Sequence, residues 1–158
     1  MGEQPGLTKD HAFMREALRE AEKAYTLGEV PVGAVVVVGE EVVSRAHNLR
    51  ESLKDATAHA EIIALRDAAQ KRGDWRLEDA VVYATMEPCP MCAGAMVQFR
   101  VKKVVYGAAD PKAGAAGSVV NLLREPRFNH QVEVKAGVLE EECREIVQRF
   151  FRQLRQRA

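Results

Sequence analysis

The sequence predicts an α/β fold in three layers, in which a mixed five-stranded sheet lies between helices. Apolar residues recur at helical spacing in several segments, and short β-branched runs separate those segments. A tight turn joins the first two strands, which makes that pair antiparallel, whereas helical crossovers make at least part of the sheet parallel. The chain has 158 residues, of which 47% are hydrophobic and 29% charged, so we expect residues 1–158 to form a single domain.

Helices are indicated by apolar positions three and four residues apart and by glycines near the ends of the pattern. The first pattern includes Phe13, Ala17 and Ala21 and ends at Gly28. We expect helices over Lys9–Leu27, from near Ala58 to near Gly73, and over Met91–Gln98, Val119–Arg124 and Glu140–Arg155.

Strands are indicated by short runs rich in valine and bounded by turn residues. Val32–Val38 and Glu41–Ala46 flank Gly39-Glu40 and predict a β-hairpin. The remaining strands are expected over Ala80–Ala84, Lys103–Tyr106 and Val132–Ala136, and Gly107–Gly117 is expected to be a loop of small residues.

Two motifs, His59-Ala60-Glu61 and Pro88-Cys89-Pro90-Met91-Cys92, together offer three zinc ligands and one further carboxylate. Structural zinc sites are closed by four protein ligands, whereas catalytic sites offer three and leave a position for water. His59 and Glu61 are expected in the first turn of a helix, about 200° apart, so that one binds metal and the other reaches substrate. Cys89 and Cys92 are expected at a second helix start, where the helix dipole favours thiolates.

This combination of residues predicts a hydrolytic nucleobase deaminase. With zinc held by His59, Cys89 and Cys92, the bound water becomes a hydroxide near neutral pH and attacks the amidine-like carbon of adenine or cytosine. Glu61 is expected to take the proton of the water, pass it to a ring nitrogen and help protonate the departing ammonia. Cys143 lies in a helical pattern and is expected in the core.

The charge distribution and the cysteine content indicate the partners and the cellular compartment of the protein. The formal net charge is zero, but five arginines against one glutamate follow Glu142, and a second basic cluster comprises Arg100, Lys102 and Lys103. The first cluster indicates either a solvated helix face or a surface that contacts phosphates. We expect a cytoplasmic protein for three reasons. The chain has only three cysteines, it starts with the short polar segment Met1–Thr8, and it contains no apolar run of the roughly 20 residues that a membrane helix needs.

The chain resembles bacterial tRNA-specific adenosine deaminases, the TadA family of the cytidine deaminase-like superfamily, over nearly its whole length. The two zinc motifs are common to the superfamily. More selective features are Asn48, the loop Asp110–Ser118, Phe128-Asn129-His130 and Phe150-Phe151-Arg152. The resemblance implies a zinc-dependent homodimer that converts adenosine to inosine at the wobble position of a tRNA anticodon.

The resemblance also implies roles for individual residues. It assigns zinc to His59, Cys89 and Cys92 and proton transfer to Glu61. It implies that substrate is bound by a set spread over the chain, namely Asn48, Asp110, Lys112, Asn129 and Phe151. Phosphate contacts are expected from Arg152, Arg155 and Arg157, and the dimer surface from Met91, Met96, Val97 and Phe99.

Each of these roles has an alternative. Asn48 is equally typical of a turn residue, and at least one of Phe150 and Phe151 is expected in the core. A guanine or cytosine deaminase would need no basic surface, and its pocket would be closed by the C-terminal segment. A zinc-stabilised RNA-binding module would keep the three ligands but would not need Glu61.

Overall fold

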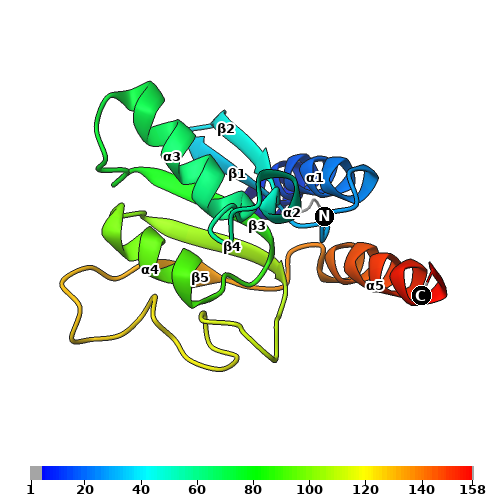
Figure 1. The fold of residues 1–158 in the computed structure, drawn as a ribbon. Coiled ribbons are helices and arrows are strands. Elements are labelled where there is room, and N and C mark those ends of the chain that lie inside the picture. The colour runs from blue at the N-terminus through cyan, green and yellow to red at the C-terminus, as the bar shows by residue number, and fades with distance from the viewer. Residues whose placement is uncertain (1–4, 158) are drawn as a thin grey trace.

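The computed structural model describes residues 5–157, with side chains described from Lys9 onward. It contains a five-stranded sheet in the order β2-β1-β3-β4-β5, with helices on both faces (Figure 1). In chain order the elements are α1 Pro5–Thr26, β1 Gly33–Val38, β2 Glu41–His47, α2 Arg50–Leu53, α3 Ala60–Arg72, β3 Ala80–Met86, α4 Pro90–Gln98, β4 Lys103–Ala108, β5 Glu133–Lys135 and α5 Glu140–Arg157. The predicted three-layer α/β fold with a mixed five-stranded sheet is confirmed. Met1–Gln4 and Ala158 of the expected domain lie outside the described residues.

The direction of the strands brings one set of loops to one edge of the sheet. β1 pairs antiparallel with both β2 and β3, while β3, β4 and β5 run parallel. The start of β1, the end of β2 and the ends of β3 and β4 therefore meet at the same edge. The loops attached there contain residues 29–32, 48–59, 87–89 and 109–118, and ligands of α/β sheets commonly bind at such an edge.

Alternate residues of each central strand enter two separate cores. Ala34 and Val36 of β1 face α3 and α4, in a core that also contains Leu65 and Met96. Val35 of β1 and its neighbours on that face pack instead against α1 and α5. This period-two alternation fixes the register, because a slip of one residue would exchange the two faces of a strand.

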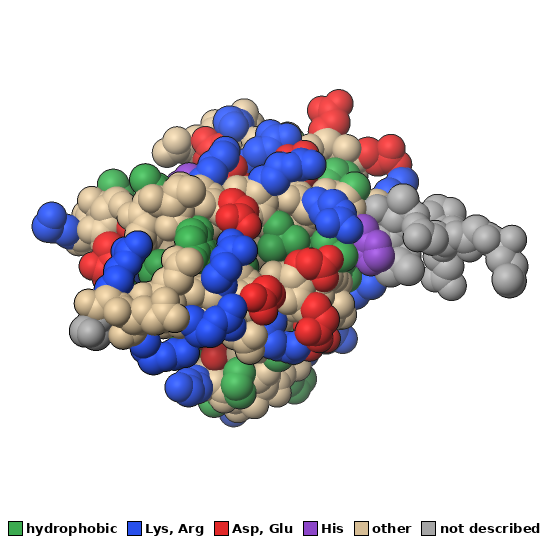
Figure 2. Space-filling view, turned by 90° about the vertical axis from the view of Figure 1, so that its right-hand side faces the viewer, with side chains coloured by type: hydrophobic (Ala, Val, Ile, Leu, Met, Phe, Trp, Pro, Cys, Tyr) green, Lys and Arg blue, Asp and Glu red, His purple; other side chains and the backbone are tan. Residues whose placement is uncertain are grey.

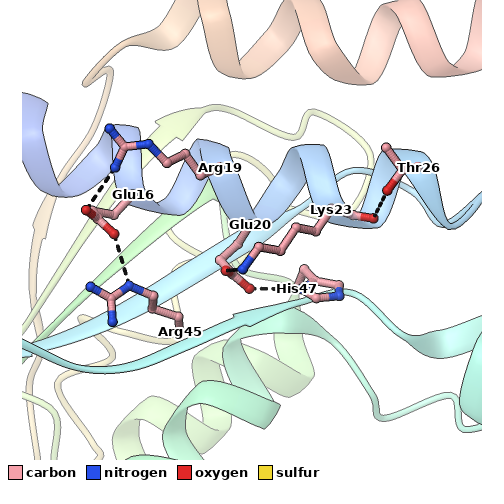
Figure 3. Close-up of polar contacts among 7 residues, drawn as sticks. All are labelled: Glu16, Arg19, Glu20, Lys23, Thr26, Arg45 and His47. Atoms are coloured by element: carbon pink, nitrogen blue, oxygen red, sulfur yellow. Dashed lines mark hydrogen bonds and ion pairs between the residues drawn. The ribbon is translucent and has the colours of Figure 1, made fainter.

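Ionic contacts tie α1 to the edge strand β2 (Figure 3). Glu16 accepts hydrogen bonds from Arg19 at 2.8 Å and from Arg45 at 3.0 Å. Glu20 is buried and pairs with Lys23 at 2.6 Å and with His47 Nδ1 at 2.9 Å. Both carboxylates thus join the helix to the strand, and the second fixes the residue directly before Asn48.

Two details of the expected fold are wrong. Residues 119–124 form no helix, because the chain turns back there: the N–H groups of Val119 and Val120 donate to Gly114 O, and Ala116 forms an isolated bridge with Asn121. The short helix α2 was not expected, since its four residues are too few to show a periodic pattern.

The apolar surface expected on α4 is also smaller than predicted. Met96 is fully buried and Val97 is 5% exposed, and both belong to the core of their own chain. Met91 and Phe99 remain half-buried. Among residues 5–157, no helix is both long and apolar enough to cross a membrane.

Candidate metal centre and active site

His59, Cys89 and Cys92 meet at one point, with one donor atom from each within 4.8 Å of the others. His59 Nδ1 lies 3.6 Å from Cys89 Sγ and 3.5 Å from Cys92 Sγ. Tetrahedral zinc with Zn–S near 2.3 Å and Zn–N near 2.0–2.1 Å requires a nitrogen–sulfur separation of about 3.6 Å. The three residues therefore fit zinc. No other group of three potential ligands occurs in the part of the chain that the structure describes.

Two helix starts hold these donors. His59 directly precedes α3, Cys89 directly precedes α4, and both have extended backbone angles. Pro90 occupies the beginning of α4, where its missing N–H costs no helical hydrogen bond. The expectation that His59 lies within the first helical turn is thus corrected by one residue, because α3 begins at Ala60.

The two thiols and the imidazole share protons in a way that favours a thiolate. Hydrogen bonds from the Cys92 thiol and the His59 ring lower the pKa of Cys89 to about 4. The bond to Cys89, together with burial, raises the pKa of Cys92. The same interaction with Cys89 raises the pKa of His59. A donor set that concentrates negative charge on sulfur suits a soft divalent cation.

Glu61 lies in the first turn of α3, with only 3% of its surface exposed. Burial raises the pKa of Glu61 to about 7, and the His59 charge opposes that shift. The side chain lines the same cavity as His59 and Cys89. A carboxylate with this environment, beside a metal site that needs no fourth protein ligand, has the properties of a general acid–base group.

The cavity above these residues has a volume of about 560 Å³, which lies within the usual range for small-molecule sites. Besides residues 59–61, its walls come from five parts of the chain. They are the segments 29–32, 48–51 and 86–89, the loop residues Asp110 and Ala113, and the α5 residues Val147 and Phe151. His59, Cys89 and Glu61 thus line a cavity that side chains from distant segments complete, whereas Cys92 is fully buried and does not line it.

Three of the five expected substrate residues line this cavity. Asn48 lines the cavity, and its side chain also forms two hydrogen bonds within the protein. Its Nδ2 donates to Val30 O at 3.2 Å, and its Oδ1 accepts from Arg50 N at 3.1 Å. Asp110 also lines the cavity, and its Oδ1 accepts hydrogen bonds from the backbone N–H groups of Lys112 and Ala113. Both side chains therefore shape their own turns as well as the cavity wall.

The aromatic pair on α5 divides its roles. Phe151 lines the cavity and is 39% exposed. Phe150 is half-buried and packs edge-on against Tyr25, with ring centroids 5.8 Å apart. The expectation that at least one member of the pair lies in the core is wrong, because α5 buries Cys143 and Ile146 instead, and Phe150 is only half-buried and belongs to neither core cluster.

A second hollow of about 650 Å³ adjoins the cavity, and both are lined by Val147 and Phe151. Lys112, Arg152 and Arg155 also line this hollow. Lys112 is therefore placed beside the cavity and not within it. Arg152 forms an exposed ion pair with Glu145 at 3.1 Å.

Two expected binding residues lie away from these hollows. Asn129 is exposed, and neither Asn129 nor Arg157 lines either one. On the face shown in Figure 2, Lys and Arg side chains are interspersed with Asp and Glu. The cationic lining of the second hollow comes from Lys112, Arg152 and Arg155.

Sequence reasoning missed several residues that line the cavity, above all Glu29 and Glu87. Glu29 is 1% exposed and accepts hydrogen bonds from the N–H groups of Glu51 and Ser52 and from the Ser52 hydroxyl. Glu87 is 3% exposed. Its position beside Pro88-Cys89, at the end of an apolar strand, was a signal that could have identified it, whereas nothing near Glu29 pointed to a role. Cys143, on the inner face of α5, is fully buried in the core, as expected.

Comparisons with known proteins find similarity to deaminases over most of the chain. Residues 8–155 match the family model of MafB19-like deaminases. The tRNA-specific adenosine deaminase of Bacillus subtilis (strain 168) is 55% identical over 151 residues, which cover 96% of this chain and 94% of that protein. The tRNA-specific adenosine deaminase of Aquifex aeolicus (strain VF5) is 46% identical, over 90% of this chain and 94% of that protein.

Two solved structures resemble this one to different degrees. The first comes from "Biochemical and Structural Studies of A-to-I Editing by tRNA:A34 Deaminases at the Wobble Position of Transfer RNA". This structure superposes on ours with a TM-score of 0.83 and is 44% identical in sequence. The match covers 85% of this chain and 98% of that one. The guanine deaminase from Nitrosomonas europaea has a TM-score of 0.76 but only 19% identity, over 94% and 93% of the two chains, and shows the fold alone. The chain belongs to the family of tRNA-specific adenosine deaminases.

Proposed function

We propose that this protein is a zinc-dependent hydrolase that deaminates adenosine to inosine at the wobble position of a tRNA anticodon and releases ammonia. The observation that carries the proposal is that His59, Cys89 and Cys92 meet at one point, and that His59 and Cys89 line a cavity of about 560 Å³ together with buried Glu61. The identity to tRNA-specific adenosine deaminases supports adenosine in tRNA as the substrate.

His59, Cys89 and Cys92 would hold one zinc ion per chain, which supplies Lewis-acid activation of water near neutral pH. Glu61 performs the proton transfers. Its carboxylate takes a proton from the attacking water and delivers it to a ring nitrogen of the base. It then helps to protonate the amine that leaves from C6.

An RNA loop is favoured over a free base by the surroundings of the cavity. A loop nucleotide is already unpaired, so its base enters a pocket at a lower cost than a base in a duplex. Asn48 offers an amide that can donate and accept, and Phe151 offers an aromatic face. Lys112 and Arg155 in the adjoining hollow provide positive charge for phosphates.

Two other functions are less consistent with these observations. A guanine or cytosine deaminase has no need of a cationic hollow beside its pocket, and the likeness to guanine deaminase supports only the fold. A zinc-stabilised RNA-binding module would leave Glu61 without a role. An ionisable side chain buried in a cavity without such a role lowers stability.

Metal analysis and activity assays on the same preparations test the proposal. We expect about one zinc per chain and formation of inosine in an anticodon stem-loop RNA, with much slower turnover of free adenosine, guanine and cytosine. Glu61→Gln should retain zinc and lower kcat by about 10²–10⁴-fold, the usual contribution of a general acid–base group. Zinc retention together with near-parent activity in Glu61→Gln would contradict the proton-transfer role. Equal rates on free adenosine and the stem-loop would contradict the RNA substrate.

We also propose that residues 1–158 act as one deaminase domain, within a homodimer in the cytoplasm. The dimer is supported by the family resemblance and by the half-buried Met91 and Phe99 on α4. The reducing compartment is supported by three cysteines without a disulfide among the described residues.

A further inference from the structure

Glu87 lies between β3 and the zinc ligand Cys89, and the chemical steps above do not use it. Its backbone N–H donates to Ala108 O at 2.8 Å, so its position follows from the parallel pairing of β3 and β4. The carboxylate is almost completely buried. A buried carboxylate needs several donors to offset the loss of hydration.

Four donors from one loop surround this carboxylate. Glu87 Oε1 accepts from Asp110 N at 3.0 Å and from the Ser118 hydroxyl. Glu87 Oε2 accepts from Ala116 N at 2.9 Å and from Ser118 N at 3.1 Å. An ionised carboxylate has about four acceptor sites, so this set satisfies it completely.

The packing of the loop shows that the contact is close as well as polar. A Cβ atom on Gly114 would lie 2.3 Å from Glu87 Cδ, so any larger residue would displace the carboxylate. Ala115 N donates to Pro88 O at 2.8 Å, one residue before Cys89. The loop 110–118 is therefore attached to the strand end that carries a zinc ligand.

We infer that Glu87 is a positioning residue that fixes the loop 110–118 as one wall of the substrate cavity. Through this loop it places Asp110 and Ala113 against the cavity and Lys112 against the adjoining hollow. Glutamine in its place has one acceptor oxygen and presents an N–H₂ group to backbone N–H donors. The inference rests on the proposed function only for the identity of the substrate.

Glu87→Gln tests the inference, with Asp10→Asn as the matched control. Asp10 is a buried carboxylate that accepts from Tyr83 Oη at 2.6 Å and pairs with Lys135 at 2.5 Å. It lines neither hollow. Both variants lose a buried carboxylate, but only Glu87→Gln disturbs the cavity wall. Zinc content, hydrogen exchange of the loop amides, and KM and kcat on the anticodon stem-loop are measured for each.

Glu87→Gln is expected to retain about one zinc per chain and to accelerate exchange of the Asp110, Ala116 and Ser118 amides. KM for the stem-loop should rise by about tenfold, which corresponds to losing one hydrogen bond to a charged group, while kcat changes much less. Asp10→Asn should lower the thermal midpoint and leave KM and the exchange of these amides unchanged. An equal change of KM in both variants, or unchanged exchange in Glu87→Gln, would overturn the inference.

Two further variants cover the case in which Glu87→Gln does not fold. Ser118→Ala removes a single donor at an exposed position, and Gly114→Ala displaces the carboxylate without changing charge. Each should accelerate exchange of the same amides and raise KM, and unchanged values in both would refute the role of Glu87. If the parent protein turned over guanine and not RNA, the proposed function would be wrong. The exchange measurement and a KM comparison on guanine would then still decide the inference.

Discussion

Asn48→Ala distinguishes the two roles that the sequence allows for this residue, a turn residue and a contact for the substrate. The side chain bridges two walls of the cavity through its bonds to Val30 O and Arg50 N. The backbone N–H of Asn48 also donates to Val32 O at 3.1 Å, and this bond remains in the variant. The substitution therefore removes two side-chain hydrogen bonds together with any bond to the substrate.

The two losses have separate magnitudes. Each internal hydrogen bond contributes about 0.5–1.5 kcal/mol, so the free energy of unfolding should fall by about 2 kcal/mol. For a chain of this length that corresponds to a decrease of about 4–8 °C in Tm. Loss of a bond to the base in a closed cavity should cost a further 1–3 kcal/mol, or roughly 5- to 150-fold in kcat/KM.

The assay combines urea unfolding with single-turnover kinetics on an anticodon stem-loop, well below the Tm of every variant. Asp55→Ala is the matched control, because Asp55 Oδ1 accepts two hydrogen bonds from Thr57 in the same segment and does not line the cavity. If Asn48→Ala lowered kcat/KM no more than Asp55→Ala at a similar loss of stability, Asn48 would be only a turn residue. The argument for base recognition would then be refuted.

Three further predictions concern the RNA surface, the packing of α5 and the dimer. Arg155→Ala should weaken RNA binding more than Arg157→Ala does, and should lower the slope of log binding constant against log salt concentration by about one unit more, because Arg155 alone of the two lines the second hollow. RNA binding measured over a salt series checks this, and equal losses of affinity in the two variants would contradict it. Gly107→Ala should lower the free energy of unfolding by about 1–3 kcal/mol, because the added Cβ of residue 107 would lie 2.3 Å from Cys143 Sγ. An unchanged midpoint of urea unfolding would show that α5 does not pack tightly on β4. Sedimentation at micromolar concentration should give twice the chain mass of 17.5 kDa, and a monomer would contradict the proposed dimer.

The three candidate metal donors could be predicted from the sequence because their arrangement is local. Cys89 and Cys92 are three residues apart at one helix start, so the period of the helix places them on one face. His59 and Glu61 are similarly close in sequence, at the start of α3. The pattern of apolar residues likewise predicted nine of the observed elements, since periodicity reports the faces that each element buries.

The limits of α3 and the irregular segment 119–124 required the structure. Whether His59 precedes a helix or begins it depends on backbone angles that no periodic pattern reveals. Val119 and Val120 could extend a helix by composition, but their N–H groups bond to Gly114 O instead. Hydrogen bonds within this loop outweigh the weak helix preference of its residues.

The sequence by itself determined which residues could supply the proposed chemistry, and only the tertiary structure decided the cavity that His59, Cys89 and Glu61 line. Asn48, Asp110 and Phe151 are separated by dozens of residues, and no local pattern relates them. The loops that carry Asn48 and Asp110 meet because β1 pairs antiparallel with β2 and β3 while β4 runs parallel to β3, and Phe151 reaches the same cavity from α5. The parallel pairing of β3 and β4 also brings the loop 110–118 to Glu87 and gives this carboxylate its four donors, because contacts between distant segments depend on strand order and direction.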